Sequence, residues 1–169
     1  GAVCWFACFR MRVRARSGSA RGVKAILWYR FLYFKFRPQY FYWGMFHLAR
    51  AALREMIAQG GGSIVNIASE SGLNGEPGLT AYCASKGAVI QMTKCMALDH
   101  IGDNVRVNSV CPGETHTKMI DDWLGTLDGD IEDNIKNLAK GLPIRRLARP
   151  EEVANAALFL ASDESSYCV

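Results

Sequence analysis

The chain has 169 residues, 50% of them hydrophobic and 21% charged, a composition typical of one globular domain with its own core. No uncharged apolar run approaches the roughly 18 residues of a membrane helix, so we expect no membrane partner. The net charge of +4 averages two unlike parts. Residues 1–43 hold nine basic and no acidic side chains, whereas residues 44–169 hold eleven basic and sixteen acidic ones.

Residues 1–43 form a basic segment that also carries thirteen of the eighteen aromatic side chains. The stretch RMRVRAR alternates with the period of a strand, but Ser17-Gly18-Ser19 ends the pattern. A secretory signal would place its basic residues before the apolar run, the reverse of the order here. A transit peptide, or contact with nucleic acid or an anionic membrane, stays open. We expect a poorly specified leader and, without a recognisable motif, no nucleic-acid partner.

The folded body is predicted to begin near Gly44 with an amphipathic helix over residues 44–59, ended by the glycines that follow. Its apolar residues recur at the spacing of one helix face. They are Met45, Leu48, Ala49, Ala52, Leu53, Met56 and Ile57. The next run, SIVNIAS, has the length and composition of a parallel strand that helices cover on both faces.

Further helices and a strand continue the alternation. We expect a long, mostly apolar helix over about 80–101 and a β-branched strand over 105–110, ended by Pro112-Gly113. Residues 114–140 are polar and predict one or two loose helices over a cleft. A last helix begins at Pro150, a residue favoured in the first turn. This order of elements predicts an α/β fold with a parallel sheet.

Three polar side chains that suit acid–base chemistry lie around the turn after the first body strand. Ser69 ends that strand, at the edge where α/β sheets bind ligands, and Tyr82 and Lys86 lie one helical turn apart. A lysine ammonium favours the phenolate and lowers the tyrosine pKa towards the working range. The set suits moving a proton on or off an alcohol while a redox cofactor exchanges a hydride with carbon. A tyrosine–lysine pair alone is also common surface decoration, and the serine at the strand end favours a site.

Neither cysteines nor histidines form a metal-binding pattern. None of the six cysteines belongs to a C-x-x-C motif, and His47, His100 and His116 are scattered. We therefore expect no metal site, and we interpret the cysteines as thiols of a reduced, cytoplasmic protein.

The body, residues 44–169, resembles the carboxy-terminal half of the short-chain dehydrogenase/reductase family. Ser69, Tyr82 and Lys86 form the motif S-x12-Y-x-x-x-K. The other matching stretches, in the expected order, are GGGSIVNIAS, AYCASKGAV, NVRVNSVCPGETHTKM and RLARPEEVANAALFLASDESSY. The resemblance implies a partial Rossmann-like fold, with a doubly wound parallel sheet in a three-layer α/β/α arrangement.

The resemblance also implies an NAD(P)-dependent oxidoreductase that interconverts a secondary alcohol and a ketone. Tyr82 would donate and accept the proton, and Ser69 would position the substrate oxygen. Lys86 would lower the pKa of Tyr82 and, together with it, contact the nicotinamide ribose. Three further residues would contact the nicotinamide end of NAD or NADP: Pro112, Gly113 and Thr117.

Several family features are absent from the sequence. It holds neither the T-G-x-x-x-G-x-G fingerprint nor the N-N-A-G turn, and Phe41 stands where the family has a fourth catalytic residue, an asparagine. We therefore expect a body truncated at both ends, without the first nucleotide-binding half and with an unpaired edge on its central strand. The substrate and the choice between NAD and NADP stay open.

Two functions of other classes also stay open. Family members commonly associate through the two long helices, here about 44–59 and 80–101, so we expect a homo-oligomer. The same helices would let a non-catalytic fragment act as an interaction module. Alternatively, the basic leader would bind nucleic acid or an anionic membrane, with the body as a passenger.

Overall fold

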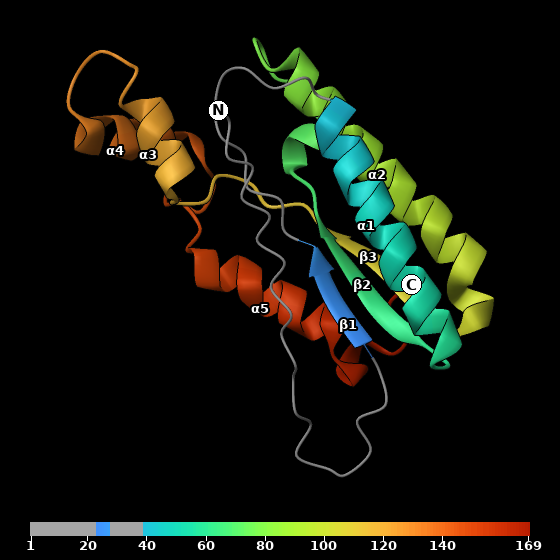
Figure 1. The fold of residues 1–169 in the computed structure, drawn as a ribbon. Coiled ribbons are helices and arrows are strands. Elements are labelled where there is room, and N and C mark those ends of the chain that lie inside the picture. Colours follow the sequence, from blue (N-terminus) through green and yellow to red (C-terminus); the bar gives the residue numbers. More distant parts are fainter. Residues whose placement is uncertain (1–22, 28–38) are drawn as a thin grey trace, which may run out of the picture.

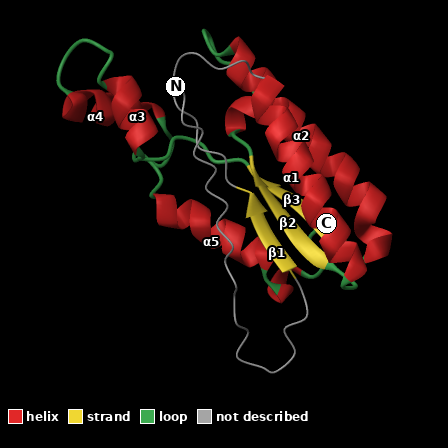
Figure 2. Cartoon of the chain, in the orientation of Figure 1, coloured by secondary structure: helices red, strands yellow, loops and turns green. Residues whose placement is uncertain are grey.

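The computed structural model describes residues 23–27 and 39–169. Within them a parallel sheet has the strand order β1 (Val23–Leu27), β2 (Gly62–Ile67) and β3 (Val105–Val110). Helices α1 (Gln39–Ala58) and α2 (Thr80–His100) cover one face, and α5 (Pro150–Ala161) covers the other (Figure 1). Figure 2 shows the resulting three-layer α/β/α arrangement, which confirms the predicted fold class.

Strand β2 forms the centre of the core because successive strand residues point to opposite faces. Ile64 packs in a cluster with Met56 of α1 and Val89 of α2, whereas its neighbour Val65 packs against Ala157 of α5. Both β2 residues are fully buried. This two-sided burial explains why the apolar residues Ile64 and Val65 follow each other directly instead of alternating with polar ones.

The carboxyl ends of β2 and β3 meet at one edge of the sheet. The pairing continues past the strands, because Ala68 N donates to Val110 O at 2.8 Å and Glu70 N donates to Pro112 O at 3.0 Å. Ser69 therefore lies directly beside the turn that follows β3. This is the edge at which parallel α/β sheets bind their ligands.

The predicted elements of the body are confirmed, and the polar segment forms α3 (Lys118–Leu124) and α4 (Ile131–Gly141). Helix α1 begins at Gln39, five residues earlier than the predicted start near Gly44. The expected unpaired edge is wrong, because β1 pairs in parallel with β2 from Val23↔Gly62 to Leu27↔Asn66. The strand-like interpretation of RMRVRAR falls outside the described residues.

Within residues 23–27 and 39–169, no helix is long and apolar enough to span a bilayer.

Candidate active site

Ser69 lies in the first turn after β2, where it precedes the short 3-10 helix Glu70–Gly72. Its Oγ accepts from the backbone N of Ser71 and also lies 3.3 Å from Ser71 Oγ. Ser71 Oγ in turn donates to the carboxylate of Glu76. Both serines are buried and Glu76 is half-buried. The Ser69 hydroxyl is thus held by its own turn.

Gly72 allows this turn to pack directly against the backbone of α2. A Cβ at Gly72 would lie 2.7 Å from the carbonyl carbon of Lys86 and 2.9 Å from the backbone N of Gly87. Backbone atoms at such distances cannot rotate aside as a side chain would. The turn and the helix therefore approach more closely than any residue with a side chain allows. This approach sets the separation between Ser69 and α2.

Tyr82, in the first turn of α2, is hydrogen-bonded to Ser69. Burial raises the pKa of the Tyr82 phenol, the hydrogen bond with Ser69 lowers it by less, and the charges of Glu76 and Glu114 raise it further. The predicted direction of this shift is therefore wrong for this structure. The sequence argument considered the charge of Lys86 and could not include the loss of water around the phenol.

Lys86 lies beside the tyrosine and is 6% exposed. Its Nζ donates to Ile67 O at 3.2 Å and lies 5.7 Å from the centroid of the Tyr82 ring. Burial lowers the pKa of Lys86 to about 8, and interaction with Cys111 opposes that shift by less. The carbonyl and the ring face thus replace only part of the hydration that an ammonium has in water.

Three glutamates gather around the same site. The pKa of Glu114 is raised by burial and by the negative charges of Glu70 and Glu76. The Glu70 carboxylate lies in the space beside Gly113, where a Cβ would be 3.0–3.1 Å from its atoms. The site is therefore richer in acidic than in basic side chains among the described residues.

The structure brings together most of the predicted site residues. Ser69 contacts Tyr82, Lys86 lies over the tyrosine ring, and Pro112 pairs with the turn that carries Ser69. Thr117 precedes α3 and its side chain makes no capping hydrogen bond to that helix.

Sequence reasoning did not single out Ser71, Glu76 or Glu114. The spacing Ser-x-Ser after a strand is a local signal of a hydroxyl-stabilised turn and would have identified Ser71. The glutamates have no comparable signal, because Glu114 reaches the site from a loop far along the chain.

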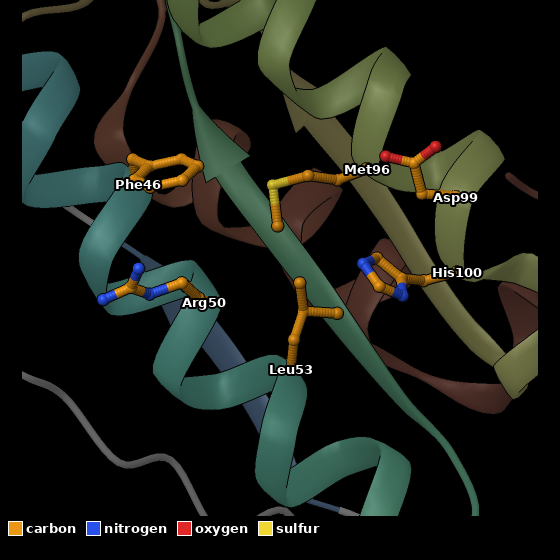
Figure 3. Close-up of a pocket in the computed structure, with 6 residues that line it drawn as sticks. All are labelled: Phe46, Arg50, Leu53, Met96, Asp99 and His100. Carbon is orange, nitrogen blue, oxygen red and sulfur yellow. The ribbon is translucent and has the colours of Figure 1, made fainter.

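A separate pocket of about 170 Å³ lies between α1 and α2 (Figure 3). Its lining residues are Phe46, Arg50, Leu53, Met96, Asp99 and His100. Met96 follows Tyr82 by fourteen residues on α2, which corresponds to about 21 Å along a helix. The pocket is thus remote from the Ser69 turn, and we do not assign the acid–base chemistry to it.

A parallel sheet with helices on both faces and polar side chains at its carboxyl edge is typical of α/β proteins that bind a ligand at that edge. A sequence profile described as Enoyl-(Acyl carrier protein) reductase matches residues 39–169. The chain is 45% identical over 125 residues to 2-(S)-hydroxypropyl-CoM dehydrogenase 3 of Xanthobacter autotrophicus, covering 73% of this chain and 48% of that protein.

Solved structures agree with this match. NAD+-bound xylitol dehydrogenase has a TM-score of 0.69 and 33% identity, with 75% of this chain and 52% of that chain covered. L-sorbose reductase from Gluconobacter frateurii, complexed with NADPH and L-sorbose, has a TM-score of 0.71 and 31% identity, with coverages of 78% and 54%. The chain belongs to the short-chain dehydrogenase/reductase family. It spans about half the length of the curated relatives it matches.

The close approach at Gly72 gives a prediction about stability. Gly72→Ala is expected to lower the free energy of unfolding by about 1–3 kcal/mol, because its Cβ meets the backbone of α2. Gly75→Ala is the matched control in the same loop, since nothing lies within 4 Å of a Cβ there. Urea denaturation followed by circular dichroism measures both. Equal stability of the two variants would contradict the close approach.

The buried lysine gives a prediction about pH. The folded state lowers the pKa of Lys86 from 10.5 to about 8, so the unfolded chain binds more protons between these values. The free energy of unfolding should therefore gain about 3 kcal/mol from this group as pH rises through that window. The gain is absent in Lys86→Met.

Urea denaturation of both proteins from neutral pH to pH 10.5 measures the difference between them. Using the difference removes the contributions of all groups that the two proteins share. Lys86→Met should lose stability relative to the native chain as pH rises. A difference that does not change with pH would show that the lysine keeps its ordinary pKa.

Proposed function

We propose that this chain provides the acid–base site of an NAD(P)-dependent oxidoreductase that interconverts a secondary alcohol and a ketone. The observation that carries the proposal is the hydrogen bond between Ser69 and Tyr82, with the buried Lys86 over the tyrosine ring. These groups lie at the ligand-binding edge of the sheet. The names of the relatives, a xylitol dehydrogenase and an L-sorbose reductase, support a polar alcohol or ketone as the substrate class.

In the proposed reaction Tyr82 exchanges the proton with the substrate oxygen, which the Ser69 hydroxyl holds beside the phenol. The raised pKa of Tyr82 leaves the phenol protonated at neutral pH, which suits donation to a ketone. Lys86 in its ammonium form stabilises the phenolate that remains after donation. The dinucleotide, when bound, supplies or removes the hydride.

The residues at this edge fit the nicotinamide end of a dinucleotide. Gly113 presents backbone without a side chain, Thr117 has a hydroxyl that does not cap its helix, and Pro112 lies two residues after the end of β3. Tyr82 and Lys86 offer groups for the ribose hydroxyls. One similar structure contains NAD+ and another contains NADPH. We therefore propose NAD or NADP as the cofactor and leave the choice between them to the binding test.

We also propose that the protein forms a homo-oligomer through α1 and α2. Both helices expose large apolar side chains, and the pocket of Figure 3 lies between them. The exposed residues are Trp43, Leu48 and Ile57 on α1 and Leu98 on α2. Contact with the same surface of a second copy of the chain would remove these apolar side chains from water.

We also propose that the protein is located in the cytoplasm. The cysteines Cys83, Cys95, Cys111 and Cys168 are all free thiols. Unpaired cysteines support a reducing environment.

The main test combines cofactor binding with turnover. Titration of the purified chain with NADH and with NADPH, followed by fluorescence, should show saturable binding, and small polyols or their ketones should be turned over. Tyr82→Phe should lower kcat by at least about a hundredfold, because general acid–base catalysis contributes on this scale. Cofactor binding should stay saturable and weaken by no more than the loss of one hydrogen bond to the ribose. Tyr167→Phe is the matched control, since Tyr167 is 98% exposed.

Two outcomes would decide against the enzyme. Equal turnover by Tyr82→Phe and the native chain would exclude Tyr82 as the acid–base group. Failure to bind either cofactor would leave the interaction module as the function to test. Salt-dependent DNA binding that disappears on removal of residues 1–43 would instead favour the leader.

The oligomer is tested by light scattering coupled to size-exclusion chromatography. Leu98→Glu places a charge on the most exposed apolar side chain of α2, which is 79% exposed, and should shift the protein towards the monomer. Ile144→Glu, at a position 65% exposed outside both helices, is the matched control. A native chain that is already monomeric at high concentration would contradict the proposed oligomer.

A further inference from the structure

A series of polar contacts leads from the Tyr82 phenol to a carboxylate at the rim of the site. Tyr82 is hydrogen-bonded to Ser69, whose Oγ lies 3.3 Å from Ser71 Oγ. Ser71 Oγ in turn donates to the carboxylate of Glu76. The serines are 8% and 6% exposed, whereas Glu76 is half-buried, so the carboxylate is the member most open to solvent. We call Ser69, Ser71 and Glu76 the serine–glutamate path.

The need for such a path rests on the proposed function. When Tyr82 gives its proton to a ketone oxygen, the phenolate has to take up another proton before the next turnover. The hydrogen bond with Ser69 favours this phenolate, because it lowers the pKa of Tyr82. Ser69 therefore lies where it can donate to the ionised tyrosine once the product alcohol has left.

Lys86 is a poor entry point for that proton. It is 6% exposed, and its Nζ donates to Ile67 O inside the fold. A proton given up by the buried ammonium would have to be replaced from solvent through the same covered position. The two serines differ from the lysine, because they connect the phenol to a half-buried carboxylate.

We propose that Ser71 and Glu76 carry a proton between solvent and the Ser69–Tyr82 pair, and so restore the Tyr82 phenol after each ketone reduction. Glu76 takes a proton from water and donates it to Ser71 Oγ. The hydroxyl proton of Ser71 passes to Ser69, and that of Ser69 passes to the phenolate. Each serine loses one proton and gains one, so the net change is one proton moved from water to Tyr82.

Hydroxyl groups suit the two inner positions of the path, because a hydroxyl donates and accepts at the same time. The 3.3 Å between the serine oxygens is long for such a bond, so transfer requires Ser71 to approach Ser69 slightly. Substrate and path use Ser69 at different times. While a ketone is bound, Ser69 donates to the ketone oxygen, and after product release the same hydroxyl turns to the phenolate. In alcohol oxidation the transfers run in reverse.

Other titratable groups near Tyr82 have to be separated from the path. Lys86 lies over its ring, and Glu114 and Cys83 act on the phenol electrostatically, as Glu76 does. Glu114 provides the matched control, because it is a carboxylate that acts on Tyr82 from outside the path. Glu114→Gln thus removes a neighbouring charge and leaves the hydrogen bonds of the path in place.

The experiment measures how fast the Tyr82 hydroxyl proton exchanges with solvent in the full chain without cofactor or substrate. Tyrosine labelled with 13C at Cζ is observed by NMR in an equal mixture of H2O and D2O, where slow hydroxyl exchange splits the signal and fast exchange merges it. The Tyr82 signal is the one lost in Tyr82→Phe. The pH and temperature are chosen so that exchange broadens this signal in the native chain.

Ser71→Ala and Glu76→Gln should each slow the exchange at least about tenfold, because a positioned acid–base group contributes roughly a hundredfold or more to proton transfer. Glu114→Gln should leave the rate nearly unchanged. Formate, added at constant ionic strength, should restore exchange in Glu76→Gln more than in Ser71→Ala, which lacks the hydroxyl between the acid and Ser69. A merely structural role of Glu76 would give no such rescue.

Two results would overturn the proposal. One is an unchanged exchange rate in Ser71→Ala or in Glu76→Gln. The other is an equal slowing in Glu114→Gln, which is the behaviour of charge alone. If Ser71→Ala does not fold, Glu76→Gln at the half-buried position decides. Because the measurement needs no turnover, its failure is distinct from a failure of the chain to act as an oxidoreductase.

Discussion

The site depends on backbone hydrogen bonds that extend the pairing of β2 and β3 beyond the strands. Ala68 donates to Val110 O and Glu70 donates to Pro112 O, so the two turns at the carboxyl edge are joined before any side chain contributes. Backbone pairing of this kind fixes the position of Ser69 independently of the loop residues that follow it. The contact of Gly72 with α2 then fixes the distance from this edge to Tyr82 and Lys86. The register of β2 and β3 and the close approach at Gly72 thus account for how the site residues are placed relative to one another.

The burial of Lys86 decides between two interpretations of the tyrosine–lysine pair. Surface decoration would leave the lysine in water, but Lys86 is 6% exposed and its pKa is lowered to about 8. At neutral pH the fold therefore holds an ammonium at a net cost, which an apolar residue at this helix position would avoid. A costly charge beside a buried phenol is typical of a functional site and supports the acid–base role proposed for the pair.

Much of this arrangement could be predicted from the sequence, for reasons that individual elements make clear. The spacing of apolar residues in α1 and the β-branched residues of β3 are patterns that burial in a core requires, so both elements could be predicted from them. The bounds of β3 match the prediction. Strand β1 was not predicted, because VKAIL is a short run inside a segment without a consistent period. Its strand conformation depends on pairing with β2, which local sequence does not encode.

The site was predicted less completely than the fold. The spacing of Ser69, Tyr82 and Lys86 was enough to place them together, since a strand end and one helix turn have fixed geometry. The direction of the Tyr82 pKa shift was wrong because it depends on how much water the folded chain removes from the phenol. That quantity depends on the whole packing around α2. The contribution of Glu114 also arises only after the loop that follows β3 folds against the site.

Burial moves the two partners of the pair in opposite directions. It raises the pKa of Tyr82 and lowers that of Lys86 to about 8, so each group favours its neutral form more than it does in water. Lys86 nevertheless still carries its ammonium at neutral pH and becomes neutral only as the pH rises through about 8. A neutral lysine does not stabilise a phenolate, and the carboxylates of Glu76 and Glu114 oppose its formation as well. The support that Lys86 gives to an ionised Tyr82 is therefore greatest below about pH 8, the range in which the proposed acid–base role of the pair would operate.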